Sequence, residues 1–287
     1  MRDFFYMKKI KYFLLAKSIG LYINLFSVIN RKKASLLAYQ FFSEPRVGKL
    51  EKENLPKILQ KAIKETVFYN EHHFQIYTWN GNSNVILLVH GWESNASRWK
   101  KMLPHLQKSG NTIIAIDAPA HGLSSGSEFN VPQYVEFMHI IIQKHQPKHI
   151  IGHSLGGIAT AYYQHIHKNH TIEKIVLLGS PSDFTIILNN FIQLLSLNSS
   201  IHQSLIAYTK DRFQINVENF STSNFLKNSK LQGIIAHDID DEVVSFTEGK
   251  KIAESWKNAN FIETKGLGHS MHDEKLYNQI VTFLEEA

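Results

Sequence analysis

A serine that could act as a nucleophile stands in the middle of the chain. Residues 152–157 read GHSLGG, which places Ser154 in a G-x-S-x-G pattern. The apolar run His149–Ile151 precedes it and an amphipathic stretch follows it, so we expect the serine at a sharp strand-to-helix turn. Such a turn presents the hydroxyl for attack on a carbonyl carbon. Gly152 and Gly156 would support the turn, because a Cβ atom at either position would crowd it.

A serine nucleophile needs a base, and the base needs a carboxylate that orients it. His269, in the segment GLGH after the last predicted strand, is the expected base. His272 is the alternative, although it is better placed to begin the final helix. The acid is less determined, because the run HDIDDEVV at residues 237–244 offers three aspartates after a predicted strand, namely Asp238, Asp240 and Asp241.

Two backbone N–H groups are expected to stabilise the oxyanion that develops during acyl transfer. One belongs to Leu155, at the start of the helix after the serine, where N–H groups are free and the helix dipole is positive. The other belongs to Trp92, because Gly91 and Trp92 follow the apolar run VILLV. In the loop DAPAHGLS, which follows the run TIIAI, we expect Asp117 and His121 to shape the loop beside the site.

An alternation of strands and helices must position these residues. From about residue 74, short apolar runs alternate with longer amphipathic stretches, and several runs are too continuously apolar for a sheet exposed on one face. This order implies a doubly wound, mostly parallel α/β sheet, whose sites lie at the carboxyl ends of the strands. The predicted strands are Phe74–Trp79, Val85–Val89, Thr112–Ile116, His149–Ile151, Ile175–Leu178, Leu231–Ala236 and Asn260–Glu263. The predicted helices are Ala96–Lys108, Pro132–His145, Leu155–Lys168, Phe246–Asn258 and His272–Glu285.

One interval interrupts this alternation. About fifty residues separate Pro181 from Lys230, far more than an ordinary crossover needs. The first part, Phe184–Leu197, is apolar, and the remainder mixes Asn, Ser and aromatic residues. We expect a helical cap insertion at about residues 181–230, over the ends of the strands.

Four segments together carry a family resemblance. HGWESN, DAPAHGLS, GHSLGG and GLGH resemble the α/β-hydrolase superfamily, particularly its lipase/esterase and serine-aminopeptidase-like branch, from about residue 74 to the C-terminus. Bacterial members with an acid loop H-x-x-x-D-x-x-V are similar from residue 237, which implies Asp241 as the triad acid. Asp240 is the runner-up, and Asp183 occupies an alternative acid position of some relatives. Haloalkane dehalogenases and epoxide hydrolases carry aspartate where this chain has Ser154, so their reactions are disfavoured.

The N-terminal segment, residues 1–42, is both apolar and basic. Residues 1–50 hold ten Lys and Arg against two Asp and Glu, a net charge of +8, whereas the remainder holds 21 against 23, a net −2. The stretch Tyr12–Ile29 has 18 residues and includes Lys17 and Asn24, so it falls short of the about 20 apolar residues of a transmembrane helix. Two interpretations stay open. These helices pack on the body with their lysines in water, or they lie on an anionic membrane or line a path for apolar substrate.

Composition excludes several kinds of chemistry. The chain has 287 residues and no cysteine, which excludes disulfides, zinc–thiolate sites and a cysteine nucleophile. The 16 histidines include no H-E-x-x-H motif, so we expect no metal and no other cofactor. Because the charge outside the N-terminal segment is near neutral, we expect no nucleic-acid partner.

We therefore expect an N-terminal extension at residues 1–70 and an α/β-hydrolase domain at residues 71–287. The expected activity is hydrolysis of an ester, thioester or amide through Ser154, His269 and Asp241, as a carboxylesterase or lipase-like enzyme on a small-molecule apolar acyl substrate. An acyltransferase or an aminopeptidase would use the same triad, and a non-catalytic ligand-binding or membrane-docked protein is the competing class. The expected location is the cytoplasm, with membrane association as the open alternative.

Overall fold

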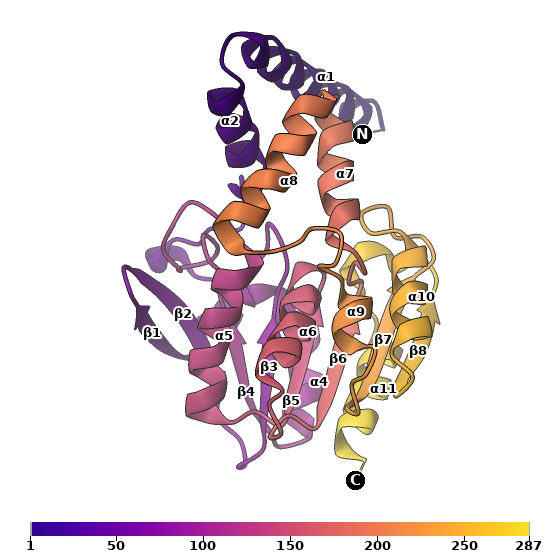
Figure 1. Cartoon of the computed structure of the whole chain (residues 1–287). Helices are drawn as coiled ribbons and strands as arrows, with labels where there is room; N and C mark the ends of the chain where they lie inside the picture. Colours follow the sequence, from indigo (N-terminus) through magenta and orange to yellow (C-terminus); the bar gives the residue numbers. More distant parts are fainter. Residues whose placement is uncertain (1, 287) are drawn as a thin grey trace. The chain divides into compact units, whose positions relative to one another are not determined.

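An eight-stranded sheet organises most of the chain, in the strand order β1-β2-β4-β3-β5-β6-β7-β8 (Figure 1). The pairs β1–β2 and β2–β4 are antiparallel, and every pair from β4 onward is parallel. The doubly wound, mostly parallel sheet expected from the sequence is confirmed. The strands are β1 (Ile63–Tyr69), β2 (His72–Trp79), β3 (Val85–Val89), β4 (Thr112–Ile116), β5 (His149–His153), β6 (Lys174–Leu178), β7 (Gln232–Asp238) and β8 (Ala259–Thr264).

The structure, a computed structural model, describes the backbone of residues 2–286 and the side chains of residues 11–286. Two units can be distinguished. The sheet unit comprises Pro45–Ser182 and the chain from Ser221 onward, and the helical unit comprises the chain up to Glu44 together with Asp183–Phe220. The extension expected at residues 1–70 is therefore shared between the units, since β1 belongs to the sheet. The side chains of residues 1–10 of the N-terminal segment lie outside the described part.

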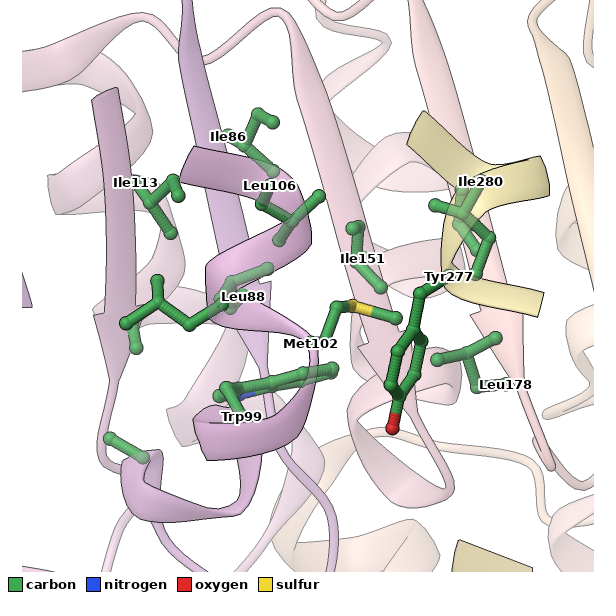
Figure 2. Close-up of a cluster of buried hydrophobic side chains, with 14 of the residues drawn as sticks. Ile86, Leu88, Trp99, Met102, Leu106, Ile113, Ile151, Leu178, Tyr277 and Ile280 are labelled. Atoms are coloured by element: carbon green, nitrogen blue, oxygen red, sulfur yellow. The ribbon is translucent and has the colours of Figure 1, made fainter. Parts of the chain in front are cut away.

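Helices cover both faces of the sheet (Figure 1). On one face, α4 (Leu103–Lys108), the 3-10 turn before it and α11 (Glu274–Glu285) pack against alternate residues of the strands. In Figure 2, Met102 and Tyr277 lie in one buried cluster with Ile151 and Leu178. Because both faces are covered, all five residues of β3 are buried, which explains its uninterrupted apolar sequence. The helices of this unit are α3 (Lys57–Gln60), α4 (Leu103–Lys108), α5 (Val131–His145), α6 (Leu155–His167), α9 (Thr222–Leu226), α10 (Phe246–Ser255) and α11 (Glu274–Glu285), with 3-10 turns at Lys52–Asn54, Ala96–Lys101 and Gly268–Ser270.

Two elements differ from the sequence prediction. The helix expected at Ala96–Lys108 is a 3-10 turn followed by the short helix α4, because Pro104 stands in the first turn of α4 and cannot donate a hydrogen bond back along a longer helix. The strand β1 was not predicted. Its residues alternate between exposed and half-buried, so this edge strand lacks the apolar run by which the other strands can be recognised.

Among the described residues, the helical unit contains four helices. They are α1 (Arg2–Ile29), α2 (Arg31–Ser43), α7 (Phe184–Leu195) and α8 (Ser199–Phe213), so the interval after β6 is helical as expected. The helix α1 packs against α2 and α7, and α2 packs against α8. Side-chain oxygens of Asn30 and Asn198 cap α2 and α8 by accepting hydrogen bonds from the first turns of these helices.

The stretch Lys11–Ile29 of α1 is long and apolar enough to cross a membrane, with 19 residues and a mean hydropathy of 1.6. The sequence reading that Lys17 and Asn24 bring this stretch below that limit was wrong, because the surrounding apolar residues outweigh them. Length and composition do not distinguish a membrane segment from a packed helix. Both the cytoplasmic location and membrane association stay predictions.

Candidate active site

Ser154 lies at a sharp turn between β5 and α6. Its backbone dihedral angles, φ 54° and ψ −124°, fall in a region that side-chain-bearing residues rarely adopt. Two hydrogen bonds hold this strained residue in place. Its N–H donates to the Leu178 carbonyl of β6 at 2.9 Å, and its carbonyl accepts from the Gly157 N–H at 2.9 Å. Strain of this kind persists only where the surrounding structure imposes it. Here the two hydrogen bonds, one to β6 and one from α6, hold the backbone of Ser154 in the strained conformation.

Glycines allow neighbouring backbone segments to approach Ser154 closely. A Cβ atom on Gly152 would lie 2.7 Å from the Gly156 carbonyl oxygen, and one on Gly156 would overlap the carbonyl of Val89 in β3. A Cβ atom on Gly91 would lie 2.7 Å from Ser154 Cβ and 3.1 Å from the Leu155 nitrogen. The turn after β3 therefore rests directly against the serine and the N-terminus of α6.

A carboxylate and an imidazole meet at the ends of β7 and β8. Asp241 Oδ2 lies 2.8 Å from His269 Nδ1. Of the other acid candidates, Asp240 is exposed, and Asp183 stands at the N-terminus of α7 in the helical unit. The alternative base, His272, makes its hydrogen bond to the Tyr277 hydroxyl at 2.6 Å.

The surroundings of Asp241 favour its ionised form. Its side chain is fully buried, and Oδ1 accepts hydrogen bonds from the N–H groups of Val243 at 2.8 Å and Val244 at 2.9 Å. Burial raises the pKa of this carboxyl, but hydrogen bonds from His237, His269 and the Val244 N–H outweigh it and hold the pKa of Asp241 below its ordinary value. Because the carboxylate is ionised, His269 Nδ1 donates to it, which leaves Nε2 of His269 free to accept a proton.

His153 connects the Asp241–His269 pair to the serine turn. Its Nε2 lies 2.8 Å from the His269 carbonyl oxygen, and the two rings are 4.8 Å apart. Because His153 directly precedes Ser154, this contact fixes the backbone of His269 beside the turn. Within the described residues, no hydrogen bond joins the Ser154 hydroxyl to His269, and such catalytic bonds often tighten only when substrate binds.

Buried polar residues hold the turn after β3, which carries Trp92. His121 Nε2 accepts from the Glu93 N–H at 2.9 Å, and Asp117 Oδ1 accepts from the Ala96 N–H at 2.9 Å. Burial lowers the pKa of His121 to about 4 and raises that of Asp117 to about 6. The imidazole of His121 is therefore neutral near pH 7, as an acceptor must be. Both residues act on the shape of the loop, in agreement with the sequence prediction.

Asp238, the last residue of β7, organises the loop before His269. Its carboxylate accepts hydrogen bonds from the N–H groups of Leu267 and Gly268, both at 3.0 Å, and from the Thr264 hydroxyl at 2.8 Å. Burial opposes ionisation, but these bonds together hold the pKa of Asp238 below its ordinary value. Asp238, on β7, thus holds the loop before His269, whereas Asp241 contacts His269 directly.

Comparison with known proteins agrees with this architecture. A family model described as the α/β hydrolase fold matches residues 84–205. A bromoperoxidase structure from Bacillus anthracis superposes with a TM-score of 0.61 at 18% identity, covering 78% of this chain and 100% of that chain. An esterase from Rhodococcus sp. ECU1013 superposes with a TM-score of 0.59 at 16% identity, covering 78% and 98%. This is an α/β-hydrolase-fold protein.

Curated relatives of this hydrolase-fold protein include several named hydrolases. Protein phosphatase methylesterase 1 of Candida albicans is 25% identical over 134 residues, which are 41% of this chain and 37% of that protein. The serine hydrolase-like protein of Homo sapiens is 30% identical over 102 residues, 33% and 49% of the two chains. The chain thus spans less than half the length of the curated relatives it matches.

The structure brings most of the predicted residues of the hydrolase-fold protein together. Gly91 and Leu155 lie beside Ser154, and Asp241 lies beside His269. Sequence reasoning missed Gly179, where a Cβ atom would lie 3.4 Å from His269 Nδ1. A glycine directly after the predicted strand IVLL is the sequence signal that could have identified it, and in the structure Gly179 has a positive φ of 53°. Among the described residues, no group of three or more His, Cys, Asp and Glu is arranged to hold a metal ion.

Proposed function

We propose that this protein is a serine hydrolase that cleaves an ester, thioester or amide through an acyl-enzyme. The observation that carries the proposal is the hydrogen bond of 2.8 Å between Asp241 and His269, next to the strained turn of Ser154. A buried ionised carboxylate on Nδ1 fixes the imidazole tautomer whose Nε2 can accept a proton. The glycines beside Ser154 allow the turn after β3 and the N-terminus of α6, which carry the two proposed oxyanion donors, to lie directly against the serine.

The mechanism assigns one step to each group. Ser154 Oγ attacks the carbonyl carbon while His269 Nε2 takes the hydroxyl proton, and Asp241 stabilises the resulting imidazolium. The N–H groups of Leu155 and Trp92 stabilise the oxyanion. The imidazolium then protonates the leaving group, and water attacks the acyl-enzyme with His269 again as the base.

We propose a carboxylic ester with an apolar acyl chain as the substrate class. The insertion after β6 is rich in apolar residues, and Phe184 and Phe191 of α7 contact Phe42 of α2 in an aromatic cluster. Relatives are named as esterases and lipases, among them the Xenopus laevis monoacylglycerol lipase abhd6-B, which is 27% identical over 97 residues, 31% of this chain and 28% of that protein. A series of p-nitrophenyl esters from acetate to palmitate should give kcat/KM values that rise with chain length.

Labelling with a fluorophosphonate probe tests the nucleophile. We expect wild-type protein to be labelled and Ser154→Ala to lose at least 10³-fold in labelling rate, which is about 4 kcal/mol. Ser94→Ala is the matched control, because Ser94 lies in the neighbouring loop after β3 and should label within two-fold of wild type. Labelling that persists in folded Ser154→Ala, or its absence from folded wild type, would contradict the proposal.

A further inference from the structure

One face of α1 carries apolar side chains that no described residue covers. Between Tyr12 and Ile29, nine large apolar side chains are more than half exposed, and Val28 and Ile29 are each 85% exposed. The exposed positions recur with helical spacing, for example at Leu14, Leu21, Leu25 and Val28. Contiguous apolar surface on this scale is typical of a surface that contacts a partner or a membrane.

Two polar side chains of α1, those of Lys17 and Asn24, point toward the rest of the helical unit. Lys17 Nζ donates to the Gln193 carbonyl at 2.8 Å and to the Ser196 hydroxyl at 2.7 Å, at the end of α7. Asn24 donates to the Ser196 carbonyl at 2.8 Å and accepts from the Asn198 N–H at 2.9 Å. The hydrogen bonds of these two side chains are therefore made to other residues of the helical unit. The arrangement is the reverse of a helix on the surface of a water-soluble protein.

Close packing prevents α1 from turning this face inward. Ala16, Gly20 and Ile23 are buried against the rest of the unit, and a Cβ atom on Gly20 would overlap the Leu195 carbonyl oxygen. Rotation of α1 would break this contact and the hydrogen bonds of Lys17 and Asn24. The apolar face is therefore held outward by the folded structure.

Positive charge lies at both ends of the apolar face. Lys11 is exposed at one end, and Arg31, Lys32 and Lys33 are exposed just beyond the other. An antiparallel pair of copies would bring these like charges together, whereas anionic lipid headgroups would neutralise them. Charge complementarity therefore favours a lipid surface over a second copy of the chain.

We propose that α1 lies in the plane of an anionic lipid bilayer surface, with the face from Tyr12 to Ile29 at the boundary between headgroups and acyl chains. An in-plane helix keeps its inward contacts with α7, because only its outer face enters the lipid. A spanning helix would have to release Lys17 and Asn24 from their partners and transfer them into hydrocarbon. Docking in this way presents the helical unit, including the insertion after β6, to the membrane.

Vesicle co-sedimentation of the full chain tests the proposal. The vesicles are phosphatidylcholine alone, or phosphatidylcholine with 30 mol% phosphatidylglycerol. We expect wild type to bind the anionic vesicles, Leu21→Gln/Leu25→Gln to bind at least ten-fold more weakly, and Arg31→Gln/Lys32→Gln/Lys33→Gln to lose most of the preference for anionic lipid. The matched control is Ile63→Gln/Phe68→Gln on β1, where the side chains are 57% and 76% exposed, compared with 60% and 62% for Leu21 and Leu25.

Three results would overturn the proposal. The first is no sedimentation of folded wild type, and the second is sedimentation that Leu21→Gln/Leu25→Gln leaves unchanged. The third is a protein that resists extraction at alkaline pH, which would indicate a spanning helix. If light scattering instead finds a dimer that Leu21→Gln/Leu25→Gln dissociates while wild type does not bind vesicles, the face is an interface between copies. Probe labelling of the same variants reports separately on the serine.

Discussion

Soluble proteins usually bury apolar side chains and expose charged ones. The turn at Ser154 and the helix α1 both depart from this rule, but in opposite directions. At the turn, charged and polar groups are buried, including Asp241 and Asp117. On α1, large apolar groups are exposed while Lys17 and Asn24 bond inward. Each departure lowers stability relative to the ordinary arrangement, so each indicates a function rather than a packing solution.

The two regions differ in where their unusual groups find interaction partners. Each buried carboxylate of the sheet unit finds its partners within the chain, as Asp241 does in His269 and two backbone N–H groups. The outer face of α1 has no covering residues among those described, and in our proposal a lipid surface covers it. A pre-organised site and a docking surface can thus be distinguished by whether their unusual groups are already paired.

We expect the largest effect from a substitution that tests whether the hydrogen bond between Asp241 and His269 is needed for the reactivity of Ser154. Asp241→Asn should lower the probe-labelling rate by about 10³–10⁴-fold, because the amide can donate to Nδ1 and hold the wrong tautomer of His269. Asp240→Asn should stay within two-fold, since Asp240 is exposed one residue away. Equal effects of the two substitutions would refute the assignment of the acid. Circular dichroism of both variants checks that they fold.

The strands from β2 onward and the residues that follow them could be predicted from the sequence, because buried strands and a serine turn have strong local patterns. The choice of Asp241 over Asp240 came from a family resemblance, and the physical reason is visible only in three dimensions. The turn after β7 exposes Asp240 and buries Asp241. The association of α1 with α7 could not be predicted, since Lys17 and Gln193 are separated by 176 positions.

A substitution at Gly20 tests whether α1 is as rigidly held as the turn at Ser154. Gly20→Val should destabilise the contact of α1 with α7 by about 2–3 kcal/mol, because the added side chain overlaps the Leu195 backbone. Ser18→Val introduces the same side chain at an exposed position of the same helix, with little change in helix propensity, and is the control. Hydrogen exchange of residues 12–29 should accelerate only in Gly20→Val. Equal exchange in both would mean that α1 is loosely held.

Acid should destabilise the protein through the buried histidine of the loop beside the site. The pKa of His121 is about 4 in the folded state, against about 6.5 when unfolded, so the unfolded chain binds more protons between these values and stability falls as pH falls. Asp117 has a raised pKa, so its contribution to the free energy of unfolding changes with pH in the opposite direction. This contribution is the same in wild type and variant. From pH 6.5 to 4.5, wild type should lose roughly 2 kcal/mol more than His121→Gln, whose amide oxygen can still accept from Glu93.

Urea unfolding of the two proteins at these pH values measures the difference. His170→Gln, at an exposed position, should behave as wild type. A variant with the full acid sensitivity of wild type would show that His121 is not the responsible group.

The smallest effect concerns a paired carboxylate that does not touch the reacting atoms. Asp238→Asn keeps the side-chain shape but replaces one acceptor oxygen, so the bonds to Leu267 and Gly268 cannot both be kept. The base then shifts slightly, and we expect about a ten-fold lower kcat with little change in KM. Asp273→Asn, which alters a carboxylate that caps α11, should change kcat less than two-fold because asparagine caps equally well. If both variants retain full kcat, the loop holds His269 in position without Asp238. Asp241 would then be the one carboxylate of this pair that matters for the reaction.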